Sequence, residues 1–258
     1  MSSFDKVFIN NRKGQKISVI VELINGQKGL AFVMHGLGGF KEQATIQTIA
    51  DAFKENRYSV IRFDTTNTIG ESDGKYEDAT VTNYYEDLED IIAWAKTQKW
   101  YTEPFCLAGH SLGALCVALF AEKYPKIVKG LAPISTVVSG QLSRDIMPKD
   151  ELKKWKKTGY QERMSSSKIG VELNLKWSHM ADRLKYDLLK KASKLTMPVL
   201  MIVGENDDKT PTEQQKMLFD KLAGKKQLHI IEGAKHTFRQ EQHLKELKQI
   251  FSKWIKGF

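Results

Sequence analysis

Short apolar segments alternate with amphipathic stretches along almost the whole chain, from about Val7 to Phe251. Strands buried on both faces of a parallel sheet appear in a sequence as short, continuous, β-branched runs, and the helices that connect them appear as periodic stretches. The alternation therefore predicts an α/β fold with a mostly parallel, doubly wound, eight-stranded sheet. The predicted strands are 7–10, 17–23, 30–34, 59–63, 105–108, 128–133, 199–203 and 228–231.

Helices are predicted between these strands at 41–56, 80–99, 112–124, 211–222 and 240–254. The alternation fails between Ser135 and Leu195, where lysines are dense and no strand pattern is clear. We interpret this stretch as a small helical cap inserted into the core. The predicted domains are a core of residues 1–134 and 196–258 and a cap, or lid, of residues 135–195.

The chain carries 40 Lys and Arg against 31 Asp and Glu, a net charge of +9. Residues 141–195 hold 14 basic and 7 acidic side chains, so most of the surplus belongs to the cap and no nucleic-acid partner is predicted. Lys153, Lys154, Lys156 and Lys157 have two open interpretations. They form a solvated helix face, or they attract anionic substrates or an anionic lipid surface to which the protein binds peripherally.

The longest uninterrupted apolar run, Ala114 to Ala121, has eight residues, whereas a transmembrane helix needs about 20. The first twenty residues lack the apolar core of a secretory signal, so we expect a cytoplasmic location. Cys106 and Cys116 lie in apolar surroundings typical of buried thiols, and their spacing matches no zinc pattern. No metal site is predicted, and the oligomeric state is left open.

Gly109-His110-Ser111-Leu112-Gly113 follows one predicted strand and opens a predicted helix. A nucleophilic serine at such a strand-to-helix junction needs a sharp turn, and Gly109 and Gly113 leave room for it. A serine hydroxyl is a weak nucleophile at neutral pH, so it needs a general base and an acid that orients the base. We therefore predict Ser111 as the nucleophile.

Asp207 and His236 each follow a late predicted strand, so they are the predicted acid and base. Asp208 competes with Asp207 for the acid role. The segment Thr210 to Glu213 matches a capping box with proline at the first helical position, which would place Asp208 beside a helix start. The other five histidines lie in turns, in a strand, in the cap or on a helix, and packing roles are expected for them.

His35-Gly36-Leu37-Gly38-Gly39 follows an early predicted strand. Its Leu37 N–H, together with the N–H of Leu112 after the nucleophile, would stabilise an oxyanion. The loop fits neither glycine pattern of a phosphate site, and no cofactor is predicted. The residues predicted to contact substrate are Gly36, Gly38, His110, Trp155 and Trp177.

These motifs, in this order and spacing, resemble the α/β-hydrolase family over nearly the whole chain, especially small serine esterases and monoacylglycerol-lipase-like hydrolases. The segment Asn67 to Gly74 is similar to a loop of cinnamoyl and feruloyl esterases, with Thr68 and Ile69 where that subgroup has Gly and His. The resemblance implies ester hydrolysis through an acyl-enzyme, without metal or cofactor.

We therefore expect a serine carboxylic ester hydrolase whose small-molecule substrate carries a small or medium acyl group. Three alternatives remain open. A monoacylglycerol lipase or lysophospholipase would use the basic cap and its tryptophans at a lipid surface. An aminopeptidase would need carboxylates to hold a substrate amine. A ligand receptor on the same fold would lack catalysis.

Overall fold

The centre of the molecule is an eight-stranded sheet. The computed structural model describes residues 2–165, 168 and 170–258. The strands follow the order β1-β2-β4-β3-β5-β6-β9-β10 across the sheet, and β2 pairs antiparallel with both β1 and β4 while the other pairs are parallel. Their bounds are β1 Ser2–Asn10, β2 Lys16–Ile24, β3 Gly29–Met34, β4 Tyr58–Phe63, β5 Phe105–His110, β6 Val128–Ile134, β9 Val199–Gly204 and β10 Lys226–Ile231.

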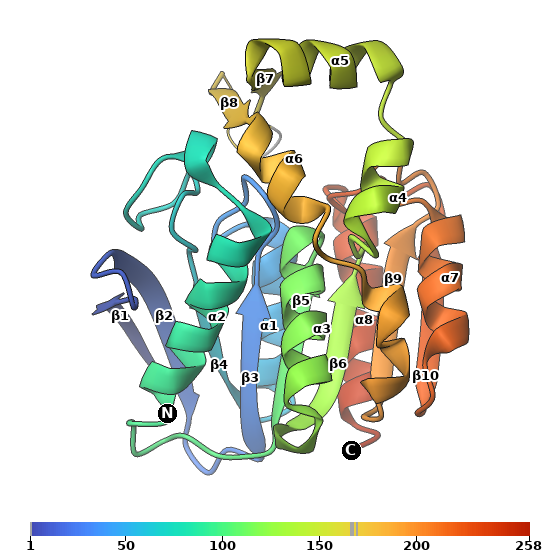
Figure 1. Cartoon of the computed structure of the whole chain (residues 1–258). Helices are drawn as coiled ribbons and strands as arrows, with labels where there is room; N and C mark the ends of the chain where they lie inside the picture. The colour runs from blue at the N-terminus through green and yellow to red at the C-terminus, as the bar shows by residue number, and fades with distance from the viewer. Residues whose placement is uncertain (1, 166–167, 169) are drawn as a thin grey trace.

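Helices cover both faces of this sheet (Figure 1). One face carries α1 (Ala44–Glu55) and α8 (Glu241–Ile255), which pack together through Phe53 and Phe251. The other face carries α2 (Val81–Ala95), α3 (Leu112–Lys123) and α7 (Thr212–Lys221). The predicted doubly wound α/β fold is confirmed, and each predicted strand and helix of the core is present with its bounds shifted by a few residues.

The central strands are buried on both faces, as their sequences predict. Every residue of β3, β5 and β9 is buried. Along β3 the side chains alternate, so that Phe32 joins the apolar cluster under α2 and α3 while Val33 joins the cluster under α1 and α8. This continuous burial holds the carboxyl ends of the strands at fixed positions, and those ends carry the candidate site.

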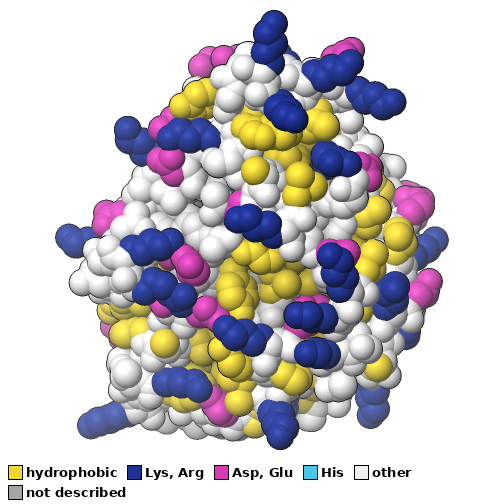
Figure 2. Space-filling model, in the orientation of Figure 1, with side chains coloured by type: hydrophobic (Ala, Val, Ile, Leu, Met, Phe, Trp, Pro, Cys, Tyr) yellow, Lys and Arg dark blue, Asp and Glu magenta, His cyan; other side chains and the backbone are white. Residues whose placement is uncertain are grey.

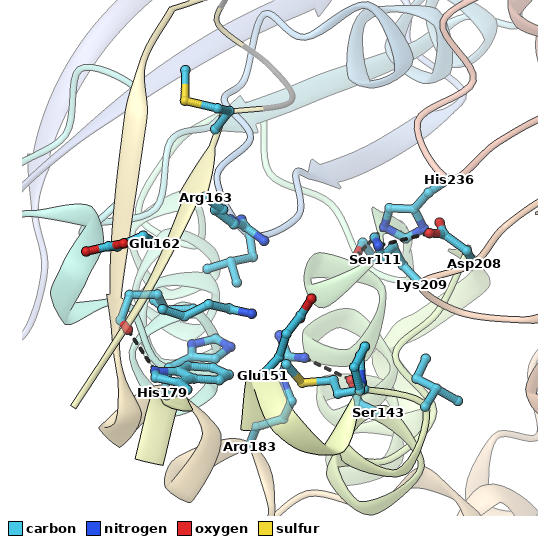
Figure 3. Close-up of a pocket in the computed structure, with 18 of the residues that line it drawn as sticks. Ser111, Ser143, Glu151, Glu162, Arg163, His179, Arg183, Asp208, Lys209 and His236 are labelled. Atoms are coloured by element: carbon cyan, nitrogen blue, oxygen red, sulfur yellow. Dashed lines mark hydrogen bonds and ion pairs between the residues drawn. The ribbon is translucent and has the colours of Figure 1, made fainter. Parts of the chain in front are cut away.

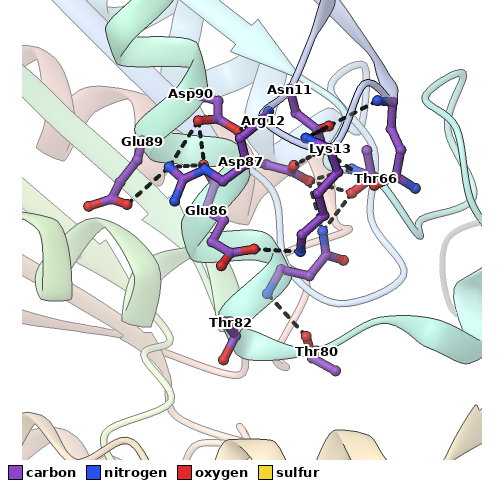
Figure 4. A network of polar contacts seen from close by, with 12 residues as sticks. Asn11, Arg12, Lys13, Thr66, Thr80, Thr82, Glu86, Asp87, Glu89 and Asp90 are labelled. Atoms are coloured by element: carbon purple, nitrogen blue, oxygen red, sulfur yellow. Dashed lines mark hydrogen bonds and ion pairs between the residues drawn. The ribbon is translucent and has the colours of Figure 1, made fainter.

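A buried carboxylate connects the β1–β2 turn, the loop after β4 and α2 (Figure 4). Asp87 accepts hydrogen bonds from Asn11 Nδ2 at 2.9 Å and from the backbone N–H and hydroxyl of Thr66, both at 2.7 Å. Burial raises the pKa of Asp87, against these hydrogen bonds, which lower it. Exposed ion pairs, Arg12 with Asp90 and Lys13 with Glu86, surround the network.

The loop after β3 is attached to the loop after β4 by a fully buried ion pair. Lys41 Nζ lies 2.7 Å from Asp64 Oδ2, and the Lys41 backbone N–H donates to Asp64 Oδ1 at 2.7 Å. Both side chains are fully buried. A paired buried charge is costly to break, since the remaining partner is left uncompensated. This pair therefore restrains the His35–Gly39 loop that precedes Lys41.

The cap segment, residues 135–195, is not purely helical as predicted. Between α5 (Lys149–Thr158) and α6 (Trp177–Arg183) lies an antiparallel pair, β7 (Tyr160–Met164) with β8 (Glu172–Lys176). The expectation of no strand in this segment is wrong, because the alternation of Leu173 and Leu175 with polar neighbours buries two side chains from one face of a short hairpin. Figure 1 shows α4 (Gly140–Asp145), α5, the hairpin and α6 above the carboxyl ends of the sheet strands.

The last part of the cap segment belongs to the side of the core. The short 3-10 helices η3 (Leu188–Lys190) and η4 (Ala192–Lys194) pack against α3 and α7. Leu188 and Ala192 are buried in the same apolar cluster as the sheet. The elements that cover the strand ends therefore stop before the predicted boundary at residue 195. Two further 3-10 helices, η1 (Tyr76–Asp78) and η2 (Pro125–Ile127), precede α2 and β6.

Basic side chains project from the top of the molecule, where α5 and the hairpin lie, and also occur singly over the core (Figure 2). Lys153, Lys154, Lys156 and Lys157 are all exposed, and Lys154 alone of the four lines the cavity described below. Within the part of the chain that the structure describes, no helix combines the length and apolar character needed to cross a membrane. The cytoplasmic location stays a prediction.

Candidate active site

Ser111 lies in a strained turn between β5 and α3. Its φ is +57° and its ψ is −115°, a backbone conformation that residues other than glycine rarely adopt. A Cβ added at Gly109 would lie 2.6 Å from the Gly113 carbonyl carbon, and one added at Gly113 would lie 2.3 Å from the His35 carbonyl oxygen. Both glycines are therefore required for the chain to turn here. The turn presents the serine hydroxyl above the sheet, beneath the cap.

The structure brings Ser111, His236 and Asp207 into one hydrogen-bonded chain. The Ser111 hydroxyl donates to His236 Nε2 at 2.9 Å, and His236 Nδ1 donates to the Asp207 carboxylate at 2.9 and 3.0 Å. His236 follows β10 and Asp207 follows β9, so adjacent parallel strands deliver the two side chains to one edge of the sheet. Figure 3 shows His236 beside Ser111 at one side of a cavity.

Asp207 is held as an anion by its neighbours. Burial by itself would raise the pKa of this carboxyl group, but the hydrogen bond and charge of His236 and the backbone N–H of Thr210 lower it well below its usual range. The Thr210 hydroxyl donates to Asp207 Oδ2 at 2.8 Å, and the Lys209 and Thr210 N–H groups donate to Oδ1. The Asp207 carboxylate therefore accepts hydrogen bonds from the His236 ring, the Thr210 hydroxyl and two backbone N–H groups.

The predicted capping box at Thr210 is wrong. Helix α7 begins at Thr212 after Pro211, without a side-chain cap, because the Thr210 hydroxyl is committed to Asp207. Asp208 instead forms an exposed ion pair with Lys209 at 2.9 Å. Its carboxylate lies on the cavity wall and makes no recorded contact with His236 among the described residues. The structure thus places Asp207, and not Asp208, against the imidazole.

His110 does not line the cavity, contrary to the prediction that it contacts substrate. It is buried behind the site, where its Nε2 donates to the His236 backbone carbonyl at 2.7 Å. Burial, and then the nearby His236, lowers the pKa of His110 to about 3. His110 is therefore neutral at ordinary pH and fixes the loop that carries His236.

The buried state of His110 predicts a pH dependence of stability. In the folded protein the His110 ring stays neutral until the pH falls to about 3, whereas in the unfolded chain it becomes an imidazolium below about pH 6.5. We therefore expect the free energy of unfolding to decrease as pH falls through this window, by up to about 1.4 kcal/mol per pH unit from this one group. Urea denaturation of wild type and His110→Gln at several pH values measures it. If the free energy of unfolding of His110→Gln fell with pH as steeply as that of wild type, His110 would not be the group responsible.

The loop after β3 approaches the serine closely. A Cβ added at Gly36 would lie 2.9 Å from Ser111 Cβ, so only glycine fits there. His35 fixes the loop by donating from Nδ1 to the Gly36 carbonyl at 2.8 Å and accepting from the Thr65 N–H at Nε2, at 3.0 Å. Among the described residues no protein acceptor is recorded for the N–H groups of Leu37 and Leu112. Both predicted oxyanion donors are thus near Ser111 and unused by the fold.

A cavity of about 740 Å³ opens between the core and the cap. Ser111, His236 and Leu37 form part of its core side, and Trp155 lies on its cap side. Trp177 is not among the described residues that line it, because this side chain packs edge-on behind Trp155 at 5.5 Å. Of the two tryptophans predicted to contact substrate, Trp155 lies on the cavity wall, and substrate contact stays a prediction.

The cavity wall contains charged and polar residues that the sequence did not single out. Arg163 comes from β7, Arg183 ends α6, and His179 lies earlier on α6. The sequence features that could have indicated a hairpin containing Arg163 are the alternation of apolar and polar residues in β8 and the glycines at 159 and 170. In the described part of the chain, no three His, Cys, Asp or Glu side chains cluster in a way that could hold a metal ion.

The fold and the arrangement of this site define an α/β hydrolase. The chain belongs to the serine aminopeptidase (S33) family, whose model matches residues 26–178 and 165–243. A curated relative, pyrrolizixenacetamide deacetylase of Xenorhabdus hominickii, is 24% identical over 254 residues, covering 87% of this chain and 88% of the relative.

Solved structures share the fold at low sequence identity. Est1E from Butyrivibrio proteoclasticus with ferulic acid bound matches with a TM-score of 0.84 and 22% identity over 97% of this chain and 98% of that one. Mouse α/β hydrolase domain-containing protein 10 matches with a TM-score of 0.81 and 19% identity over 98% and 99% of the two chains.

Proposed function

We propose that the protein is a serine carboxylic ester hydrolase that acts through an acyl-enzyme on a small-molecule ester with a small or medium acyl group. The hydrogen-bonded chain from Asp207 through His236 to Ser111, at the wall of a cavity under the cap, is the observation that carries this proposal. A serine in this arrangement can lose its proton to the imidazole as it attacks a carbonyl carbon.

The proposed reaction has two halves. Ser111 Oγ forms a bond to the ester carbonyl carbon while His236 Nε2 takes the hydroxyl proton, and the N–H groups of Leu37 and Leu112 stabilise the oxyanion, each by about 3 to 4 kcal/mol. The imidazolium then protonates the departing alkoxide, and the acyl-enzyme remains. Water, deprotonated by His236, attacks the acyl carbon and releases the acid and Ser111.

Asp207→Asn tests the role of the acid. The amide cannot fix the required imidazole tautomer, so we expect turnover to drop by about ten-thousandfold. Asp208→Asn is the matched control, since Asp208 is exposed and pairs with Lys209. It should change turnover by less than about threefold, as expected for a surface carboxylate. Steady-state kinetics of both variants decide the matter, and the opposite ranking would transfer the acid role to Asp208.

The charge of the cavity favours an ester over a peptide with a free amine. Among the described residues, five cationic side chains line it, namely Lys154, Arg163, Arg183, Lys209 and Lys235, against three acidic ones, Glu151, Glu162 and Asp208. A free amino group would be repelled by this surplus. The family's aminopeptidase description and the deacetylase relative nevertheless make amide substrates a useful comparison.

A panel of substrates tests the proposal. It contains 4-nitrophenyl esters from acetate to palmitate, methyl ferulate, a monoacylglycerol and an aminoacyl 4-nitroanilide. We expect a burst of nitrophenol and steady turnover with short and medium esters. A preference for the monoacylglycerol would favour a lipase at a lipid surface, turnover of the anilide alone would favour an aminopeptidase, and inactivity toward all of them would favour a receptor.

A further inference from the structure

Arg183 is a cation of the cavity wall, and no acidic partner is found for it among the residues that the structure describes. It ends α6, is partly buried, and donates from Nη1 to the Ser143 hydroxyl at 2.8 Å. Its Nε is buried and has no hydrogen-bond partner among the described residues. A buried donor without an acceptor is costly, which indicates that something outside the protein satisfies it.

A second arginine faces the same cavity. Arg163 lies on β7 and is exposed at the rim of the cavity, with its guanidinium over the Tyr76 ring at 5.4 Å to the ring centroid. A Cβ added at Gly38 would lie 3.3 Å from Arg163 Nη2, so this guanidinium lies against the loop that also carries Leu37. In Figure 3 both arginines extend from the cap side of the cavity, opposite Ser111 and His236.

Neither arginine has a carboxylate oxygen within 4.0 Å among the residues that the structure describes. The four residues outside that set are Met, Ser, Ser and Ile, which have no side-chain carboxylate. Three other arginines are ion-paired, Arg12 with Asp90, Arg62 with Glu22 and Arg144 with Asp145. Arg57 and Arg239 have no ion pair in the described part of the chain, but both are exposed to solvent. The acidic residues of the cavity, Glu151, Glu162 and Asp208, are exposed. Within the described part of the chain, two guanidinium groups, one exposed and one partly buried, thus line one cavity with no carboxylate oxygen within 4.0 Å of either.

Two further features of this wall indicate a polar ligand. Burial, and then the charge of Arg163, lowers the pKa of Arg183 to about 10, so a bound anion would relieve both effects. His179 is fully buried on the same wall, its Nδ1 donates to the Ala79 carbonyl at 2.9 Å, and no partner for its Nε2 is found in the described part of the chain. A purely alkyl ligand would leave the Arg183 and His179 nitrogens unsatisfied.

We propose that Arg163 and Arg183 form an anion subsite, so that the substrate is an ester with a carboxylate or phosphate group on the part that contacts the cap. Guanidinium groups bind such anions through paired N–H donors. The proposal rests on the proposed esterase function and specifies its substrate class.

A matched pair of soluble esters tests this subsite. The mono-4-nitrophenyl ester of adipic acid carries a terminal carboxylate, and the corresponding adipamic ester carries a neutral amide of the same shape. We expect wild type to prefer the carboxylate ester in kcat/KM by about tenfold or more, since hydrogen bonds to charged groups are the strong ones. Arg183→Gln and Arg163→Gln should each reduce that preference severalfold, and the double variant should abolish it.

Arg144→Gln is the matched control, because Arg144 is ion-paired on α4 and lies outside the described cavity lining. It should keep the wild-type preference. Equal kcat/KM for the two esters in wild type would overturn the proposal, and so would a preference that persists in the double variant. Arg183→Lys, which keeps the charge, should retain part of the preference and serves if Arg183→Gln fails to fold.

Binding separates this inference from the esterase proposal. Calorimetry with adipate and the Ser111→Ala variant reads the subsite without turnover, and Arg163→Gln in that background should weaken binding by about tenfold. If binding is seen but no ester is hydrolysed by wild type, the subsite stands and the esterase proposal fails. Soluble butyl phosphate and lysophosphatidic acid vesicles distinguish a free phosphate from a lipid headgroup, and failure of all three anions to bind would refute the subsite.

Discussion

Ser111→Ala is expected to lower ester turnover by about a millionfold, since loss of the nucleophile in a serine triad has an effect of this order. The substitution removes only the hydroxyl that donates to His236 Nε2. Alanine also has a Cβ, so it adopts the φ of +57° at the same cost as serine. The fold should therefore stay intact while the attacking atom is lost.

The measurement is the steady-state rate with 4-nitrophenyl butyrate, together with a thermal unfolding curve for each variant. Ser252→Ala on α8, on the opposite face of the sheet from α3, is the matched control and should retain wild-type turnover. Retention of more than about a hundredth of the wild-type rate by Ser111→Ala would contradict the assignment, because residual catalysis without a nucleophile is far smaller.

His236→Ala should reduce turnover about as strongly as Ser111→Ala, because the triad acts as a unit and the serine loses its proton acceptor. His236 is the residue that contacts both Ser111 and Asp207. The substitution removes the imidazole ring and leaves a methyl side chain, so His236 can neither accept the serine proton nor protonate the leaving alkoxide.

His243→Ala provides the comparison for that variant. His243 is buried on α8, seven residues after His236, and its removal affects packing rather than the site. We expect turnover per folded molecule close to wild type. An inactive His243 variant beside an active His236 variant would show that the loop after β10 is assigned to the wrong histidine.

The core could be predicted because its signal is local. The runs at β3, β5 and β9 are short, apolar and bounded by glycine or polar residues. This pattern is typical of strands buried on both faces of a parallel sheet. The β7–β8 hairpin was missed because β7 is mostly exposed and carries no apolar alternation. The weak alternation in β8 was the signal available.

The positions of Ser111, Asp207 and His236 follow from one rule, that ligand-binding residues lie at the carboxyl ends of parallel strands. The same rule cannot show side-chain direction. His110 follows that pattern yet points behind the site, and Thr210 binds Asp207 rather than capping α7. Arg163 and Arg183 are brought to one cavity only by the folding of the cap over the sheet, which no local pattern encodes.

Covalent labelling with a fluorophosphonate tests the central claim most directly. An activated serine forms an oxygen–phosphorus bond with this reagent and releases fluoride, whereas an ordinary serine does not react. Peptide mass spectrometry should find one phosphonyl group per chain, on Ser111, in proportion to the loss of ester turnover, and none in the His236→Ala variant. Labelling at another residue, or full inhibition without modification of Ser111, would contradict the account.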